Sequence, residues 1–150
     1  MREVKRTLRR HIGWREFIDL PDLKAKGIKV KVDTGATTSA LHAENICIFT
    51  KNGKKKVSFT IYPKQRNKTK KVSAVADLVE IRKVRSSTGH LTERPVIQTV
   101  IRIGGVEPFE IEITLVNRDI MGFRMLLGRK AVKKKFLVHP GKSFLLSEKP

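Results

Sequence analysis

The feature that most constrains this chain is an Asp-Thr-Gly-Ala motif at residues 33–36, placed directly after the segment Ile28–Val32. Apolar and basic residues alternate through that segment, which predicts a half-buried β-strand. Much later in the chain, the stretch Leu126–Arg129 places two leucines before a glycine and an arginine. The motif occurs once. The fold must therefore hold one particular carboxylate at a turn directly after a strand.

The rest of the chain predicts a mostly β domain with one short helix. Alternating or apolar runs recur between glycine-rich turns, and Asn52-Gly53 lies between two such runs, which is a strong hairpin signal. We expect strands at 14–18, 28–32, 46–49, 57–61, 79–85, 95–103, 109–116, 136–138 and 143–146, and a short helix at 128–135. Many short strands joined by such turns indicate a barrel or a sandwich.

The length of 150 residues fits a single folded domain. A basic arm is expected over residues 1–12 and the domain over 13–150. The single cysteine, Cys47, lies between two isoleucines and is expected to be a small buried hydrophobe. It cannot form a disulfide within the chain, which agrees with a reducing compartment. The basic start leads into no apolar run, and no segment is long enough to span a membrane, so we expect a cytoplasmic protein.

The formal net charge of +19 exceeds what solubility requires. Such a charge predicts an acidic partner, which could be RNA, a ribosome surface, an anionic membrane or an acidic peptide. The alternative is a lysine-rich surface that only contacts solvent. Aromatic residues make up 6% of the chain, which gives little support for a stacking platform for single-stranded nucleic acid.

A strand that leads into Asp-Thr-Gly, followed a domain's length later by apolar-apolar-Gly-Arg, is the half-site pattern of an aspartic peptidase. Hydrolysis of a peptide bond without a metal or a covalent nucleophile needs an activated water and a polarised carbonyl. Two carboxylates about 3 Å apart supply both, because they share one proton: the ionised group takes a proton from water and the protonated group donates to the carbonyl oxygen. One motif provides one carboxylate, so the hypothesis requires a homodimer in which Asp33 meets its own copy on a two-fold axis.

The neighbours of Asp33 suit this role, although an ordinary turn is the alternative explanation of an Asp-Thr-Gly sequence. Gly35 is expected to let the backbone approach the carboxylate, to adopt turn angles that a Cβ would resist, and to donate its N–H to the carboxylate. Thr34 offers a hydroxyl that could brace the opposing loop of the second chain.

The chain resembles the retropepsins, which are half-size aspartic peptidases that act as homodimers. More closely, it resembles the family labelled "ATP-dependent zinc protease", which includes RimB-like proteins and is often found beside or fused to RimK-type glutamate ligases. The segments that carry this resemblance are 31–43, 94–97, 117–118 and 121–129. The resemblance implies a closed acid-protease β-barrel, a homodimer and a peptide or protein substrate. The charged ends of this chain predict a weaker dimer than the apolar terminal strands of viral retropepsins give.

The resemblance also assigns the candidate site residues. Asp33 is the expected catalytic residue. The expected supporting residues are Thr34, Gly35 and Ala36 in the turn, with Gly128 and Arg129 packed behind it. The expected flap over the substrate is the hairpin tip Arg85, Ser86, Ser87, Thr88 and Gly89.

The family label is not supported by the motifs of this chain. ATP use would need a Gly-x-x-x-x-Gly-Lys-Ser/Thr phosphate loop, and a zinc peptidase would need clustered ligands such as His-Glu-x-x-His, neither of which is present. The histidines, at positions 11, 42, 90 and 139, are scattered along the chain. We therefore expect no metal and no cofactor.

The sequence thus predicts an aspartic endopeptidase that acts on acidic or glutamylated protein segments. One alternative is a non-catalytic basic module that docks on a ribosome, RNA or a glutamate ligase. Another is a basic nucleic-acid-binding barrel, which would bind RNA with a steep salt dependence.

Overall fold

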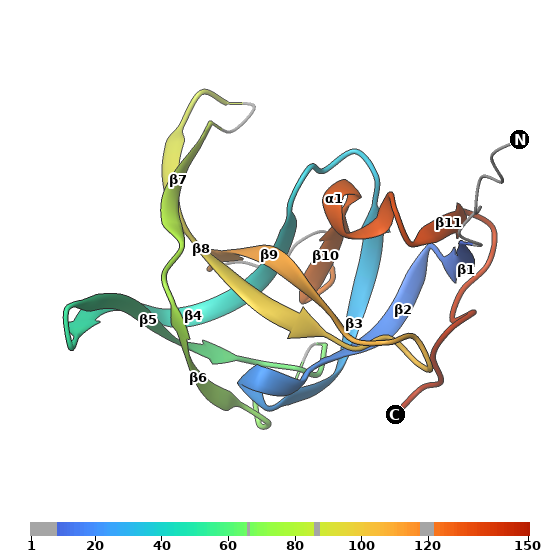
Figure 1. Cartoon of the computed structure of the whole chain (residues 1–150), viewed down its shortest axis with the longest axis horizontal. Helices are drawn as coiled ribbons and strands as arrows, with labels where there is room; N and C mark the ends of the chain where they lie inside the picture. The colour runs from blue at the N-terminus through green and yellow to red at the C-terminus, as the bar shows by residue number, and fades with distance from the viewer. Residues whose placement is uncertain (1–8, 66, 86–87, 118–121) are drawn as a thin grey trace, which may run out of the picture.

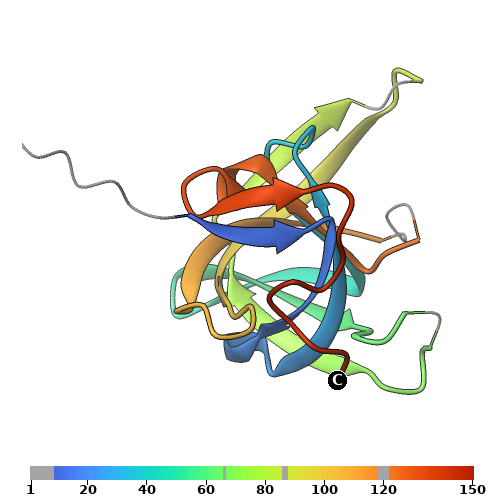
Figure 2. The same cartoon turned by 90° about the vertical axis from the view of Figure 1, so that its right-hand side faces the viewer.

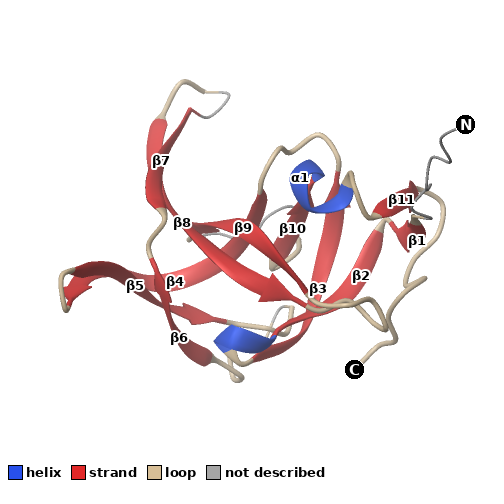
Figure 3. Cartoon of the chain, viewed as in Figure 1, coloured by secondary structure: helices blue, strands red, loops and turns tan. Residues whose placement is uncertain are grey.

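A computed structural model describes residues 9–65, 67–85, 88–117 and 122–150 of the chain, and these residues are mostly β-strand (Figures 1 and 3). The strands in this part of the chain are β1 (Arg10–Gly13), β2 (Arg15–Leu20), β3 (Ala25–Asp33), β4 (Ser39–Lys51), β5 (Lys54–Ile61), β6 (Val72–Asp77), β7 (Glu80–Arg85), β8 (Leu91–Ile101), β9 (Phe109–Val116), β10 (Met125–Gly128) and β11 (Phe136–His139). The helices are the 3₁₀ turn η1 (Pro21–Leu23) and the short α1 (Arg129–Val132). Neither has the length and apolar character needed to cross a membrane.

One large mixed sheet organises the molecule. Its strands follow the order β2-β3-β10-β4-β9-β8-β7, and β5 and β6 extend it from the outer half of β4. The pairs β3–β10 and β4–β9 are parallel, whereas the neighbouring pairs are antiparallel. A separate parallel pair, β1 with β11, lies beside this sheet. Strand β10 is therefore held between β3 and β4, deep in the sheet, and its end lies where the turn after β3 begins.

The prediction of a closed barrel is not confirmed. Within the described residues, no ladder of strands closes on itself. The two sides of the sheet approach each other at a single bridge, where Asp19 and Arg102 exchange backbone hydrogen bonds of 2.9 Å. The contact stays a one-residue bridge and does not extend into a strand pair, because the chain turns at Gly104 and Gly105 directly afterwards.

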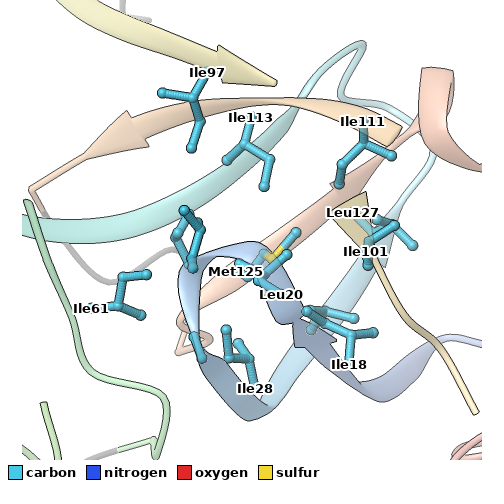
Figure 4. Packing of buried hydrophobic residues seen from close by; sticks show 14 of the residues in the cluster. Ile18, Leu20, Ile28, Ile61, Ile97, Ile101, Ile111, Ile113, Met125 and Leu127 are labelled. Carbon is cyan, nitrogen blue, oxygen red and sulfur yellow. The ribbon is translucent and has the colours of Figure 1, made fainter. Parts of the chain in front are cut away.

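The core lies inside the curved sheet and is built from the residues of each strand that face inward (Figure 4). In β3, residues 28, 30 and 32 are buried and the lysines between them are not, as the alternation predicts. Strand β9 was predicted with its observed bounds. The Asn52-Gly53 hairpin is also confirmed: both residues have positive φ, 52° and 76°, as a two-residue hairpin turn requires.

Cys47 is exposed, so the prediction of a buried cysteine is wrong. Strand β4 runs much further than expected, and its outer half pairs only with β5 in a hairpin that projects from the body of the sheet (Figure 1). Within that half, Ile46 is partly buried against the core. Ile48, beside Cys47, is 41% exposed.

The segment 143–146 is not the expected strand. Its backbone instead bonds to the carboxylate of Glu16, which is fully buried. Glu16 Oε2 accepts hydrogen bonds from the N–H groups of Gly13 at 2.8 Å and Leu145 at 3.0 Å. Oε1 accepts from the N–H of Leu146 at 3.2 Å and from the N–H and the hydroxyl of Ser147 at 3.1 and 2.6 Å. One buried side chain therefore replaces the partner strand that this segment lacks.

The basic arm expected over residues 1–12 falls partly outside the described residues. Within the described part, Arg10–Gly13 forms β1 and pairs with β11, with Ile12 fully buried. The strands β1 and β6 were not predicted, because each is short and only weakly alternating.

Candidate active site

Asp33 is the last residue of β3, and its side chain is half-buried. It lies opposite Gly128 in the parallel pair of β3 with β10. A Cβ on Gly128 would lie 2.5 Å from the carbonyl carbon of Thr38 and 2.8 Å from the backbone nitrogen of Ser39. Only glycine lets the chain after Asp33 cross directly over the end of β10. The two motifs that stood out in the sequence are thus side by side.

The turn after β3 is bonded to the Asp33 carboxylate. The Gly35 N–H donates to Asp33 Oδ1 at 3.0 Å, and the Ala36 N–H donates to the Asp33 carbonyl at 3.2 Å. The expected N–H donation from Gly35 is confirmed. The expected unusual backbone angle is not, since Gly35 is not among the residues with positive φ. What glycine provides here is space, because a Cβ would lie 3.3 Å from Oδ1.

Arg129 holds the turn from behind. Its backbone N–H donates to the Ala36 carbonyl at 2.7 Å. Its guanidinium donates to the Thr34 carbonyl at 3.2 Å and to the Thr37 hydroxyl at 3.3 Å. The structure therefore brings Arg129 together with the Asp-Thr-Gly turn, in the position that the resemblance implied.

Ser39 is a supporting residue that the sequence analysis did not single out. Its buried hydroxyl accepts a hydrogen bond from the Gly128 N–H at 3.0 Å, and its carbonyl accepts one from the Thr114 hydroxyl at 3.3 Å. It joins β4, β9 and β10 directly beneath the turn. The signal that could have identified it is the run of three hydroxyl residues that follows Ala36.

A hollow of about 470 Å³ adjoins the turn. Its walls are the turn after β3 and the hairpin of β7 and β8, which rises from the sheet beside that turn (Figure 1). Its lining residues are Ala36, Thr37, Thr38, Ala40, Arg82, Val84, Arg94, Thr114, Val116 and Leu126. We call this hollow the cleft. No Asp or Glu lines it; Asp33 ends the strand that leads into this turn, three residues before the lining residue Ala36.

Arg82 connects the hairpin to the turn, and it was also missed by the sequence analysis. Its guanidinium donates to the Thr38 hydroxyl at 3.1 Å and forms ion pairs with Glu80 at 2.9 Å and Glu112 at 3.4 Å. The hydrogen bond that Arg82 donates to Glu80, and then the smaller contribution of Glu112, raise the pKa of Arg82 above its ordinary value. Arg82 is therefore held on the cleft wall as a guanidinium whose charge is offset by these two carboxylates.

The predicted flap residues are only partly described. Arg85 ends β7, and Thr88 and Gly89 lie in the turn at the hairpin tip, all three exposed to solvent. Gly89 has a φ of 86°, which favours glycine. Ser86 and Ser87 lie outside the described residues. Among the described residues of the tip, Arg85, Thr88 and Gly89 do not line the cleft, and Thr88 lines a second hollow of about 620 Å³ on the β4 side of the same hairpin.

The described residues hold no group of three His, Cys, Asp or Glu side chains suited to a metal. The buried His42 contacts a guanidinium nitrogen of Arg124 through Nδ1 at 2.9 Å, and its Nε2 lies 3.6 Å from Glu44. These groups lie towards the other end of β10 from Asp33. The chemistry that this site offers is one carboxylate with a fixed orientation.

The chain is similar over most of its length to known proteins. A crystal structure of a protein with unknown function from Legionella pneumophila matches with a TM-score of 0.75 and 30% identity, covering 91% of this chain and 98% of that one. Proteins named probable alpha-L-glutamate ligase are 44% identical in Shewanella pealeana and 37% identical in Desulfotalea psychrophila, over 92% and 91% of this chain. The chain spans about 30% of the length of these ligases.

The model of the RimB-like family, described as retropepsin-like aspartic endopeptidase RimB, matches residues 11–149. The matched range contains both the Asp-Thr-Gly turn and the glycine and arginine that pack behind it. The chain belongs to the RimB-like family of retropepsin-like aspartic endopeptidases.

Proposed function

We propose that this protein is an aspartic endopeptidase that becomes active as a homodimer. The observation that carries the proposal is the state of Asp33. One of its oxygens is held by the Gly35 N–H, whereas Oδ2 has no hydrogen-bond partner among the described residues. A carboxylate that is oriented on one side and available on the other, on the strand that leads into a turn lining a cleft without Asp or Glu, is half of an acid–base pair.

The proposed reaction uses Asp33 from each protomer. The ionised carboxylate takes a proton from a water molecule, whose oxygen attacks the peptide carbonyl carbon, while the protonated partner donates to the carbonyl oxygen. The tetrahedral intermediate then collapses, the C–N bond breaks, and the amine leaves with a proton from the pair. Gly35 contributes by keeping Oδ1 in place, so that Oδ2 meets the water.

The turn is suited to a two-fold axis. Thr34 is exposed, and its hydroxyl makes no hydrogen bond to the described residues, although its carbonyl is held by Arg129. In the dimer, we infer that this hydroxyl bonds to the backbone of the partner's turn. The sheet of each protomer then corresponds to an acid-protease barrel with its seam at the Asp19–Arg102 bridge.

The proposed substrates are acidic or glutamylated protein segments in the cytoplasm. The chain carries a net charge of +19, and two arginines, Arg82 and Arg94, line the cleft, of which Arg82 is paired with Glu80 and Glu112. The positive field of the whole chain favours a negatively charged substrate over a neutral one. The relatives named as glutamate ligases contain a region similar to this chain, which supports a role near such a ligase or the ribosome.

The test compares two peptides that differ only in a tail, either six glutamates or six glutamines. We expect faster hydrolysis of the glutamate peptide, with a rate that rises more steeply than linearly at low protein concentration because the dimer is the active species. The variant Asp33→Asn should abolish hydrolysis of both peptides. The matched control is Asp22→Asn, at an exposed position on η1, which should leave hydrolysis unchanged. Hydrolysis that survives Asp33→Asn would refute the mechanism, and equal rates on both peptides would refute the substrate class.

The second candidate is a non-catalytic binding module, which the isolation of Asp33 within one chain favours. Sedimentation at high protein concentration separates the two. A strict monomer that leaves both peptides intact would establish the binding role, whereas a dimer with Asp33-dependent hydrolysis excludes it.

A further inference from the structure

A third hollow, at the opposite end of β3 from Asp33, is surrounded by lysines. It has a volume of about 790 Å³ and lies between the start of β3 and the connection from β5 to β6. We call it the lysine groove. Lys24, Lys26 and Lys29 line it from the first segment, and Lys64, Lys70 and Lys71 line it from the second. Lys149 adds a seventh ammonium group from the last residues of the chain.

The groove is separate from the cleft. Lys29 is the last residue of β3 that lines the groove, and Asp33 ends the same strand four residues later, which corresponds to about 13 Å along an extended chain. Figure 2 shows the β5–β6 connection and the C-terminal end together at the lower side, and the turn after β3 at the upper side. The lysine groove therefore cannot be part of the acid–base chemistry proposed for Asp33.

The charge of the groove is not balanced by the described residues. No carboxylate lines it, and none of its seven lysines forms an ion pair with a described carboxylate. The acidic residues Asp19 and Glu148 line a neighbouring hollow, which shares Phe17, Gly27 and Pro150 with the groove. Lys29 Nζ lies 5.7 Å from the centroid of the Phe123 ring. Ammonium groups gathered around one concave surface repel each other, and a polyanion would relieve that repulsion.

The chemistry of the lining favours phosphates over nucleobases. Phe17 is the aromatic residue of the groove, and its ring is already stacked on Phe144 at 5.0 Å between centroids, with 17° between the planes. No free ring is therefore offered to a base, which disfavours single strands. Lysine acts as a point charge on a phosphate without demanding a fixed geometry, unlike the planar fork of arginine.

From this placement we propose that the lysine groove binds the phosphate backbone of duplex RNA. The lysines surround a hollow from opposite sides rather than following a line. Lysines on two opposing segments can contact both strands of a duplex at once, and the narrow major groove of A-form RNA brings the phosphates of its two strands close together, whereas the major groove of B-form DNA is about 12 Å wide. Binding is independent of sequence and strongly dependent on salt.

The experiment measures fluorescence anisotropy with a labelled 16-base-pair RNA duplex at increasing salt. Seven phosphate contacts predict a slope of log K against log salt of about −6, so affinity falls by about 10³- to 10⁴-fold between about 50 and 200 mM. The triple variant Lys26→Gln, Lys70→Gln, Lys71→Gln should reduce the slope to about −4. The control Lys55→Gln, Lys133→Gln, Lys134→Gln loses the same charge from exposed positions outside the groove and should keep the steeper slope.

Three competitors complete the design: the matching DNA duplex, the single RNA strand and polyglutamate. Each is expected to displace the labelled RNA less well than the unlabelled RNA duplex does. Equal loss of affinity in both triple variants would overturn the assignment to the groove, and stronger competition by polyglutamate would overturn RNA in favour of an acidic protein. Asp33→Asn should leave RNA binding unchanged, so failure of this proposal and failure of the peptidase proposal are distinguishable.

Discussion

Replacing Glu16 by glutamine tests whether one buried carboxylate fastens the C-terminal segment. In the native protein each carboxylate oxygen accepts at least two hydrogen bonds, from the N–H groups of residues 13, 145, 146 and 147 and from the Ser147 hydroxyl. Glutamine has the same shape but puts an NH₂ group in place of one oxygen. Whichever way the amide turns, that NH₂ faces at least two donors, and those donors lose their acceptor.

A buried donor left without a partner costs about 1–3 kcal/mol, and the donors from residues 145–147 are only part-buried, so the change predicts a loss of about 1–3 kcal/mol in the free energy of unfolding. For a domain of this size, a loss of about 2 kcal/mol lowers the midpoint of thermal unfolding by roughly 4–8 °C. Urea unfolding followed by circular dichroism measures the free energy, and limited proteolysis reports whether residues 143–147 detach first.

The matched control is Glu107→Gln, which alters an exposed carboxylate that forms no hydrogen bond or ion pair with the described residues. It should shift the unfolding free energy by less than about 0.5 kcal/mol. If Glu16→Gln proves as stable as this control, the carboxylate does not hold the segment, and the account of the C-terminal fastening is wrong.

Three further results are expected. Gly128→Ala should cost about 1–3 kcal/mol of stability by urea unfolding and abolish peptidase activity, because its Cβ meets the backbone at Thr38; full activity would contradict the packing. Ser39→Ala leaves the buried Gly128 N–H without its acceptor and should cost about 1–3 kcal/mol in the same assay, with Ser39→Thr as the milder comparison. Hydrogen bonds from Lys56 and then Lys54 lower the pKa of Asp77, so any stability gained from these pairs is present at neutral pH and is lost as the pH falls through the lowered pKa. Since Asp77 is exposed, Asp77→Asn should match the wild-type melting midpoint at pH 7, and a clear drop would show that this surface pair matters more than its exposure suggests.

The sequence predicted those parts of the fold that depend on local patterns. The conformations of β3, β9 and the Asn52-Gly53 turn are each determined by a few residues that are neighbours in the sequence. The structure confirms all three predictions. The Asp-Thr-Gly turn was located for the same reason.

The sequence could not predict features that depend on distant partners. Cys47 and its isoleucine neighbours form an apolar run, but which of them is covered depends on what packs on the strand: Ile46 packs against the core, whereas Cys47 and Ile48 are exposed. Glu16 occurs in a weakly alternating run, and its burial makes sense only once the C-terminal segment lies against it. Arg82 likewise belongs to the site through Thr38, which lies 44 positions away in the chain.

The parallel pairing of β3 with β10 has a consequence for when the protein can act. Arg129 and Thr34, which meet behind the reactive turn, are 95 positions apart in the chain. A contact between such distant segments forms late, because a long loop must close first. A ribosome must therefore release almost the whole domain before the turn is braced, so an unfinished chain would lack the peptidase activity proposed for the folded protein.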